Sequence, residues 1–205
     1  MKKHVIHYET FLRVTRAISE SKDPEEVVLM TAESVKTALG VKGCAIFLIN
    51  KKNNQLELAA SYGLSEKYLK KGPINYMKSI RESLDESPVA IYDVTDDPRI
   101  QYPQEAKEEG ISSILAVPII VHGKVIGALR VYTSEPWDFN LRDVNLIQAV
   151  SQICGMAIDS CRLRKGYKTS IEILKNMRDP KEIKSNLWTP FEGVPSSVDQ
   201  PVFDY

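Results

Sequence analysis

Cysteine is the residue type with the most direct chemistry in this chain, and it occurs three times. Thiol catalysis needs a thiolate whose pKa is lowered by its surroundings and, for redox work, a second thiol within reach. Cys44 begins an apolar segment, whereas Cys154 and Cys161 lie seven residues apart on the apolar stripe of a predicted helix. We therefore predict three buried thiols and no disulfide framework, with a bond between two copies through Cys154 or Cys161 as the redox alternative.

Histidine and aspartate supply candidate metal ligands. His4 and His7 are spaced to share a helix face, but a zinc site needs three or four ligands and no acidic or cysteine cluster adjoins them. Asp93, Asp96 and Asp97 lack the spacing and the closing glutamate of a calcium loop. We predict no metal site; instead, Asp93 caps a turn and Asp97 fixes the course of a loop.

The overall composition limits the class of protein. Lysine plus arginine equals aspartate plus glutamate at 27 each, and this zero net charge argues against nucleic-acid or anionic-membrane binding. No apolar run is long enough to span a bilayer, and no signal-peptide core follows the first residues. Together with the small number of cysteines, these features predict a soluble cytoplasmic protein.

Hydrophobic periodicity predicts the elements that must position these residues. A helix is expected between a cap at Asp23 and a stop at Gly40, and another is expected to begin at a cap on Asn140. Further helices are expected at 5–21, at 74–84 and just before Gly110. The expected strands are 44–50, 56–62, 89–93 and a pair across 113–133 with a His122-Gly123 turn. The last pair is almost continuously apolar, which suits a sheet covered on both faces.

A tail of different composition follows Asp179-Pro180. From residue 186 it contains three prolines, little charge and four aromatic residues without a period, so it cannot build a core of its own. We expect it to be disordered or laid along a surface. Its candidate partner-binding anchors are Trp188, Phe191, Phe203 and Tyr205.

Four segments of the chain, taken in order, resemble the GAF domain family. They are FLRVTRAISESKDPEEVV (11–28), SPVAIYDVTDDPRI (87–100), EGISSILAVPIIVHGKVIGALRVY (109–132) and WDFNLRDVNLIQAVSQICGMAI (137–158). The resemblance covers about residues 11–163 and implies an α+β, PAS-related fold with a central antiparallel sheet of about six strands. It implies terminal helices on one face of the sheet, and shorter helices with the 93–102 loop over a small-molecule pocket on the other. The expected division is a GAF domain at 1–165 and a helical extension with tail at 166–205.

The resemblance also supplies candidate ligand-binding residues. Arg99 and Tyr102 would be polar contacts from the loop over the pocket, and an arginine suits a carboxylate or a phosphate. The full candidate set is Phe47, Tyr62, Tyr76, Asp93, Arg99, Tyr102, Leu115 and Val117.

Three ligand chemistries known in similar proteins can be compared with these residues. Covalent bilin attachment uses a pocket cysteine, usually beside a histidine, and the corresponding region here holds neither, so we predict no bilin. Cyclic-nucleotide-binding relatives carry an Asn-Lys pair followed by Phe and an Asp-Glu pair, of which only Phe139 and Asp143 match, so a cyclic nucleotide is a minor alternative. Free methionine sulfoxide reductases need an activated thiol, which is not expected here.

Taken together, the resemblance predicts a non-enzymatic sensory or regulatory module that binds a small molecule, forms a homodimer and signals to a partner protein in trans. The dimer is expected because the apolar stripe of the last helix is too apolar to leave exposed. The predicted interface residues are Phe11, Leu12, Ile18, Val144, Ile147, Val150, Cys154, Ile158 and Cys161. The alternatives are a docking protein with an empty pocket that acts through its tail, and a thiol enzyme.

Overall fold

The computed structural model describes residues 11, 12, 15, 16, 18, 19, 23–50, 55–72 and 87–177. The chain divides into two compact units, residues 1–164 and residues 165–205. The six described residues between 11 and 19 are helical, in the segment where the sequence predicts a helix. The predicted helix at 74–84 lies outside the described residues.

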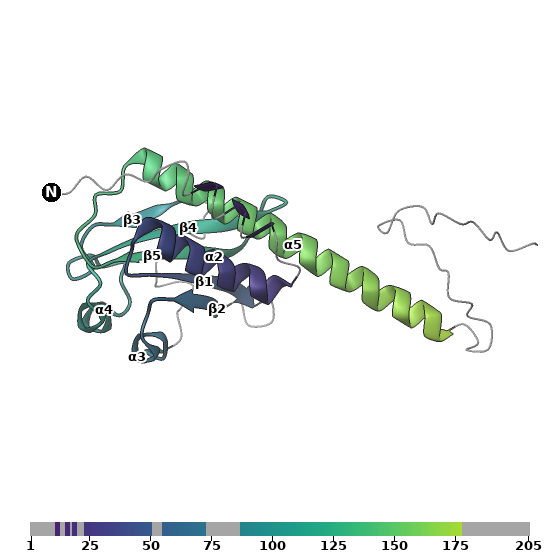
Figure 1. Cartoon of the computed structure of the whole chain (residues 1–205). Coiled ribbons are helices and arrows are strands. Elements are labelled where there is room, and N and C mark those ends of the chain that lie inside the picture. Colours follow the sequence, from purple (N-terminus) through teal and green to yellow (C-terminus); the bar gives the residue numbers. More distant parts are fainter. Residues whose placement is uncertain are drawn as a thin grey trace, which may run out of the picture. The chain divides into compact units, whose positions relative to one another are not determined.

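A five-stranded antiparallel sheet forms the centre of the first unit (Figure 1). Its strands are β1 (Gly43–Asn50), β2 (Gln55–Tyr62), β3 (Val89–Ile91), β4 (Ser113–Val121) and β5 (Lys124–Thr133). Their order is β2-β1-β5-β4-β3, which makes the short strand β3 an edge strand and puts β5 in the middle. The predicted α+β fold is confirmed, with five strands in the described residues where about six were expected.

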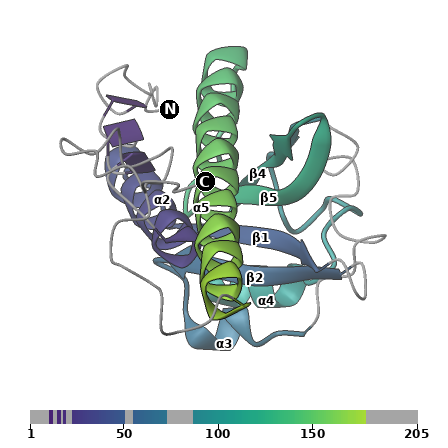
Figure 2. The same ribbon diagram turned by 90° about the vertical axis from the view of Figure 1, so that its right-hand side faces the viewer.

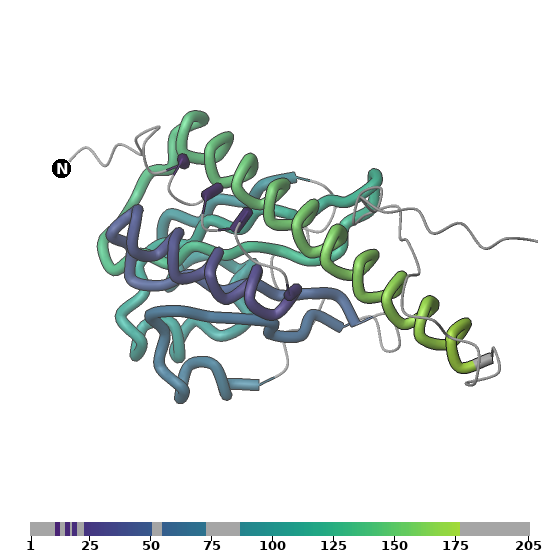
Figure 3. The backbone as a smooth tube through the Cα atoms, turned by 45° about the vertical axis from the view of Figure 1, so that its right-hand side comes forward, coloured from purple at the N-terminus to yellow at the C-terminus, as the bar shows by residue number. Residues whose placement is uncertain are grey.

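The turn between β4 and β5 forms at the predicted dipeptide. His122 and Gly123 adopt φ values of 50° and 70°, and Val121 pairs with Lys124. Two positive φ values in succession match the twist of a tight hairpin, which explains a glycine at the second position. Nε2 of His122 lies 3.0 Å from Oδ2 of Asp159 in the last helix, so the tip of the hairpin is held against that helix (Figure 3).

Two helices, α2 (Pro24–Leu39) and α5 (Leu141–Met177), begin at the predicted caps. Oδ1 of Asp23 accepts from the Glu25 amide at 2.9 Å, and Oδ1 of Asn140 accepts from the Arg142 amide at 2.8 Å. Each carboxylate or amide oxygen thereby satisfies one of the donors that a helix start leaves unpaired. None of the helices in the described part of the chain is both long and apolar enough to cross a bilayer.

Two short helices, α3 (Glu66–Leu69) and α4 (Pro103–Glu109), lie on the other side of the sheet from α2 and α5 (Figures 1 and 2). α4 ends at Gly110 as predicted, whereas α3 was not predicted. α3 begins at Ser65, whose hydroxyl accepts from the Tyr68 amide at 3.2 Å. Four residues are too few to show a helical period, so only this cap marks the element in the sequence.

The sheet separates two apolar layers, as its continuously apolar strands predict. In the first, the helix-side core, α2 and α5 cover Cys44, Ile46, Leu129 and Val131. In the second, the loop-side core, α3 and α4 contribute Tyr68 and Ala106. The sheet residues of this loop-side core are Ala45, Phe47, Leu56, Val89, Ile91, Ile114, Ala116, Ala128 and Tyr132.

α5 approaches β4 closely because it carries a glycine and a serine where the two elements meet. A Cβ atom at Gly155 would lie 2.9 Å from Cγ2 of Ile119 and 3.0 Å from Cγ2 of Val121. One turn earlier, the buried hydroxyl of Ser151 donates to the carbonyl of Pro118 at 2.7 Å. Branched side chains anchored on a strand have little room to move away, so the contact tolerates no larger residue.

We expect Gly155→Ala to lower the free energy of unfolding by about 1–3 kcal/mol, because the added methyl overpacks the contact with β4. Glycine to alanine within a helix otherwise gains about 1 kcal/mol. Gly166→Ala in the same helix is the matched control, because a Cβ atom there meets nothing within 4 Å. Chemical denaturation of both variants measures the difference. An unchanged or raised midpoint for Gly155→Ala would show that α5 does not pack closely here.

Candidate functional site

Among the residues that the structure describes, Arg130 in the middle of β5 is the most deeply buried charged residue of the loop-side layer. It pairs across the sheet with Ala45 on β1 and with Ala116 on β4. Only 4% of its surface is exposed, and the two alanines and Ala128, the next residue on the same face, are fully buried. These small neighbours leave space above the sheet for the long side chain of Arg130. Because a guanidinium is always charged, β5 places a buried cation in an apolar layer.

Aromatic residues lie on more than one side of this guanidinium. Its Cζ atom lies 5.1 Å from the centre of the Phe47 ring, a distance at which the ring face attracts a cation. The guanidinium also donates a hydrogen bond to the hydroxyl of Tyr132, whose pKa is raised by burial, with Arg130 acting against the shift. The ring of Tyr68 meets that of Tyr132 edge to face, with centroids 5.9 Å apart. Two tyrosines from α3 and β5 thus flank the cation.

A second cation, Lys71, lies beside the same tyrosine pair. Its Nζ atom is 3.4 Å from the centre of the Tyr68 ring and donates to the Tyr68 carbonyl at 3.0 Å. Burial, followed by repulsion from Arg130, lowers the pKa of Lys71 to about 8, and Glu105 and Glu109 only partly oppose that shift. Lys71 and Arg130 are therefore close enough for their charges to repel each other.

The segment that carries Lys71 is fixed to α4 by ionic contacts. Glu109 accepts from the amide of Ser65 at 3.0 Å and from its hydroxyl, and it lies 3.7 Å from Nζ of Lys42. Burial alone would raise the pKa of Glu109, but these partners lower it below its usual value. A further pair, Lys67 with Glu108 at 2.7 Å, joins the exposed sides of α3 and α4. Glu109 is thus committed to holding the segment that presents Tyr68 and Lys71.

Two of the predicted ligand-binding residues lie near this cluster. Phe47 forms the aromatic wall beside Arg130, and Tyr102 lies against the residue that follows Lys71. Gly72 adopts a φ of 134°, and a Cβ atom there would lie 2.7 Å from the Tyr102 hydroxyl. A glycine is therefore needed both for the backbone angle and for the close approach of the tyrosine. The hydroxyl of Tyr102 also accepts from Nε2 of Gln101 at 3.0 Å.

The predicted residues Asp93 and Arg99 organise their own loop. Oδ1 of Asp93 accepts from the amide and the hydroxyl of Thr95 at 2.8 and 2.7 Å, and these bonds lower its pKa. The Arg99 guanidinium lies 2.6 Å from Oδ2 of Asp97 and holds the pKa of that carboxyl below its usual value. The predictions that Asp93 caps a turn and that Asp97 fixes the loop are confirmed. Within the described ranges, no three His, Cys, Asp or Glu side chains are grouped to hold a metal ion.

The remaining predicted ligand residues lie elsewhere. Leu115 and Val117 belong to the helix-side core, so they do not face the same side of the sheet as Phe47. Alternation in a fully buried strand does not reveal which face a side chain takes, and this placement corrects the expectation. Tyr62 is 38% exposed, and the centre of its ring lies 5.7 Å from Nζ of Lys36 on α2. Tyr76 lies outside the described residues.

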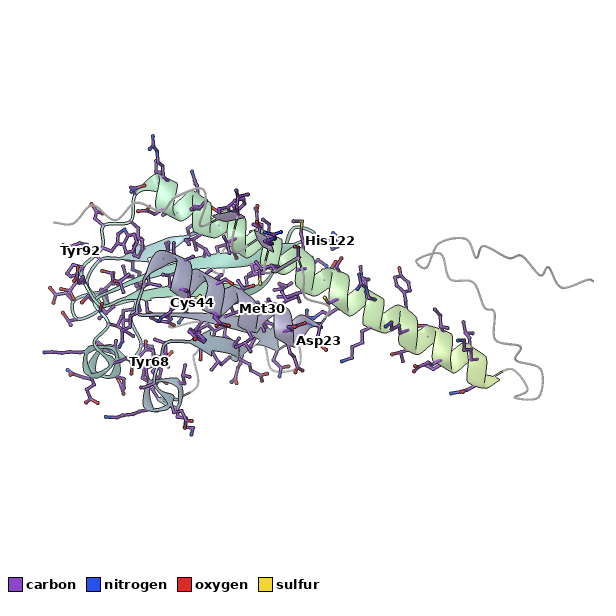
Figure 4. All side chains as sticks on the ribbon, viewed as in Figure 1. Asp23, Met30, Cys44, Tyr68, Tyr92 and His122 are labelled. Atoms are coloured by element: carbon purple, nitrogen blue, oxygen red, sulfur yellow. The ribbon has the colours of Figure 1, made fainter. Side chains whose placement is uncertain are left out.

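All three cysteines are buried in the helix-side core, as predicted. Burial raises the pKa of Cys154 to about 11 and that of Cys44 further still, with Cys154 adding to the effect on Cys44. Figure 4 labels Cys44 and Tyr68, which belong to the two opposite layers. The thiols of Cys44 and Cys154 are therefore protonated at neutral pH, and the sheet separates all three cysteines from the cluster around Arg130.

The predicted interface stripe of α5 packs within its own chain. Ile147, Val150, Cys154, Ile158 and Cys161 are buried against the sheet and α2, as is Ile18. The stripe is thus covered in one copy, and its apolar character no longer requires a dimer. Phe11 and Val144 are partly buried against the same core, whereas Leu12 is 48% exposed. The tail residues Trp188, Phe191, Phe203 and Tyr205 lie outside the described residues.

The sequence analysis missed Arg130, Lys71, Tyr68 and Tyr132. The available signal was an arginine inside the apolar segment VIGALRVYT, at a position where alternation predicts burial. Tyr68 and Lys71 are placed by helix α3, which the sequence analysis did not predict. Nothing in the sequence therefore indicated that they lie near Arg130.

The comparisons with known proteins agree with this architecture. The GAF domain family model matches residues 21–159, and the chain belongs to that family. GAF domains are commonly sensory or regulatory modules that bind small molecules. No curated protein matches the chain.

Several solved structures share the fold. The GAF domain of a phosphoenolpyruvate-protein phosphotransferase from Acinetobacter has 23% identity and a TM-score of 0.66, covering 76% of this chain and 93% of that one. A corresponding domain from Coxiella burnetii has 19% identity and a TM-score of 0.69, covering 77% and 95%. A free methionine-R-sulfoxide reductase from Neisseria meningitidis, solved with its substrate, has 17% identity and a TM-score of 0.66, covering 78% and 99%. These identities support a shared fold.

We expect Lys71 to react with an acylating reagent near pH 8 much faster than Lys67, because only a neutral amine is a nucleophile. Burial lowers the pKa of Lys71 to about 8, whereas the bond to Glu108 raises that of Lys67. Competitive labelling across pH, read by mass spectrometry, gives both pKa values. Arg130→Met should raise the pKa of Lys71, because it removes the nearby positive charge. A Lys71 pKa near 10.5 in the unmodified protein would contradict the described placement.

Proposed function

We propose that this chain is a non-enzymatic sensory module that binds a small molecule at the loop-side face of its sheet. The observation that carries this proposal is the buried Arg130 on β5, next to Lys71 and the tyrosine pair. A buried guanidinium beside aromatic rings, with a partly buried ammonium next to it, offers hydrogen-bond donors and flat apolar surface to a small polar ligand. The GAF family membership supports this reading, because such modules commonly bind small molecules.

A binding role is favoured over catalysis by the state of the thiols. The Neisseria protein with a similar fold is a free methionine-R-sulfoxide reductase. Reduction of a sulfoxide by a cysteine needs a thiolate that can attack and a path for the substrate to reach it. In this chain Cys44 and Cys154 have raised pKa values, and all three thiols are buried in the helix-side core.

We therefore expect the purified protein to produce no free methionine from methionine sulfoxide in the presence of a thiol reductant. The Neisseria reductase serves as the positive control. If methionine appears, each cysteine is replaced singly by alanine, and circular dichroism checks that the variants fold. Loss of turnover in one folded variant would overturn the non-enzymatic proposal.

A second copy of the chain is the proposed partner of the exposed face of α5. In the part of α5 that belongs to the first unit, steps of four and three residues connect the exposed residues Met156, Ser160 and Leu163, here called the outer stripe. The same spacing continues along the sequence of the second unit at Tyr167, Ser170 and Leu174. Such spacing is the heptad repeat of a coiled-coil seam. Each residue of the outer stripe comes two positions after a buried residue of α5, namely Cys154, Ile158 or Cys161. Two positions correspond to about 200° of rotation, so the outer stripe lies on the opposite side of the helix from the buried one. The outer stripe thus differs from the buried stripe that the sequence suggested as the interface.

We expect the unmodified protein to be a dimer at micromolar concentration and Leu163→Glu to be a monomer, because a carboxylate in the seam would be desolvated. Leu141→Glu is the matched control: Leu141 is 80% exposed on the same helix and lies outside the outer stripe. Size-exclusion chromatography with light scattering measures the mass of each. A monomeric unmodified protein, or equal loss of the dimer in both variants, would reject this interface.

The output of the module is proposed to pass to another protein in trans. The aromatic residues of the tail, Trp188, Phe191, Phe203 and Tyr205, stay candidate contacts for such a partner. Their role is a prediction from the sequence, since aromatic side chains in a polar segment make effective anchors.

A further inference from the structure

We propose that the acidic, aromatic segment of residues 186–205 docks within its own chain on a basic face of α5, formed by Lys165, Lys168 and Lys175 and here called the lysine face. The site belongs to the second unit, residues 165–205, and it depends neither on the small-molecule ligand nor on the dimer of the proposed function. Docking would keep the aromatic residues of the tail covered until another protein displaces them.

The lysine face is a charged stripe on the exposed end of α5. Steps of three and seven residues connect Lys165, Lys168 and Lys175, so the three side chains lie on one side of the helix. All three residues are exposed, and within the described ranges no carboxylate forms an ion pair with any of them. With Glu172 as its one acidic residue, the helical segment 165–177 has a net charge of +2, from three lysines and one glutamate.

The lysine face is separate from the side of α5 proposed for the dimer. Ser170 continues the spacing of the outer stripe, and it comes two positions after Lys168. Two positions correspond to about 200° of rotation around a helix. A segment bound to the lysine face therefore leaves the outer stripe available to a second copy.

An apolar side chain lies beside the lysine face. Ile171 follows Lys168 by three positions and precedes Lys175 by four, so it is a neighbour of both on the helix surface. Leu174, three positions further on, is 64% exposed. Lysine side chains also have apolar stems, and their ammonium groups are attracted to the faces of aromatic rings. This surface can therefore accept aromatic side chains as well as carboxylates.

The composition of residues 186–205 complements that surface. The segment contains Glu192, Asp199 and Asp204 but no lysine, arginine or histidine, so its net charge is −3. The whole chain has zero net charge, so opposite charges are concentrated in two nearby segments. The four aromatic residues of the segment offer ring faces to the ammonium groups. Charge and aromatic content thus both favour the lysine face as the docking site.

The connection between the two segments is long enough for the chain to fold back. Residues 178–185 follow Met177, the end of α5, and eight residues span at most about 26–29 Å. The helix from Met177 back to Lys165 is only about 18 Å long. Residue 186 can therefore reach any lysine of the face. A short connection also gives the segment an effective concentration on the order of millimolar, which favours docking within one copy over docking on another.

The test is zero-length cross-linking of the full-length protein with a carbodiimide, which joins a lysine to a carboxylate only where the two are in contact. We expect the three carboxylates of residues 186–205 to link to the lysine face at least tenfold more than to Lys107. Lys107 is the matched control, because it is an exposed lysine of another helix, α4, outside the second unit. Mass spectrometry of the digested protein measures both yields.

Charge reversal tests the electrostatic attraction. Lys168→Glu together with Lys175→Glu should lower the yield of links at Lys165 at least fivefold, because the carboxylates are then repelled. The same substitution of the control lysine in α4 should leave that yield unchanged. Adding Glu192→Lys and Asp199→Lys to the first variant should restore links, with amine and carboxylate exchanged between the two segments. The substituted residues of α5 are exposed, and circular dichroism checks that each variant folds.

A mixture of ¹⁴N- and ¹⁵N-labelled protein shows whether a link joins one copy or two, once native mass spectrometry shows that any dimers have exchanged copies. Links within one isotope support docking within the chain, whereas links mostly between isotopes would place the segment on a second copy and overturn the proposal. Equal yields at the lysine face and at Lys107, or yields that charge reversal does not change, would also overturn it. These outcomes do not involve the small-molecule ligand, so failure here leaves the proposed function standing.

Discussion

The central position of β5 is the constraint on which both layers of this protein depend. The strand is hydrogen-bonded to β1 on one side and to β4 on the other, and its residues 127–133 are buried on both faces of the sheet. Leu129 and Val131 join the helix-side core, whereas Arg130 and Tyr132 belong to the opposite layer. A register shift by one residue would move the guanidinium into the apolar core under α2 and α5. The cost of burying that charge there makes the observed register strongly preferred.

The two layers therefore differ in what their burial achieves. The helix-side core joins aliphatic residues to three buried cysteines, and α5 approaches β4 closely at Gly155. Close packing of this kind contributes stability. In the loop-side layer, the two cations and the tyrosines lower the net gain from burial, because charged groups lose hydration there. Such a loss of stability is expected where a protein binds a ligand. This difference between the two layers is the physical basis for proposing a function at the loop-side face.

The sequence predicted the elements better than it predicted the site. Asp23 and Asn140 carry cap chemistry that depends only on neighbouring residues, so both helix starts were predictable. The His122-Gly123 turn is local in the same sense. Strands buried on both faces give no sign of which side chain faces which layer, and this is why Leu115 and Val117 were grouped with Phe47. The pair of Lys71 and Arg130 joins residues 59 positions apart through the unpredicted helix α3, and such a contact has no local signature.

The geometry of β4 and β5 also gives the cluster around Arg130 a physical connection to α5. Ala116 lies beside Arg130 on the loop side, while its neighbours Leu115 and Val117 belong to the helix-side core. Further along β4, Ile119 meets Gly155 of α5 with no room to spare. If ligand binding displaced β4, the close contact between Ile119 and Gly155 would pass the displacement to α5 as a shift of the helix. The outer stripe of the proposed dimer lies on that same helix, and a shift of α5 would therefore alter how two copies meet.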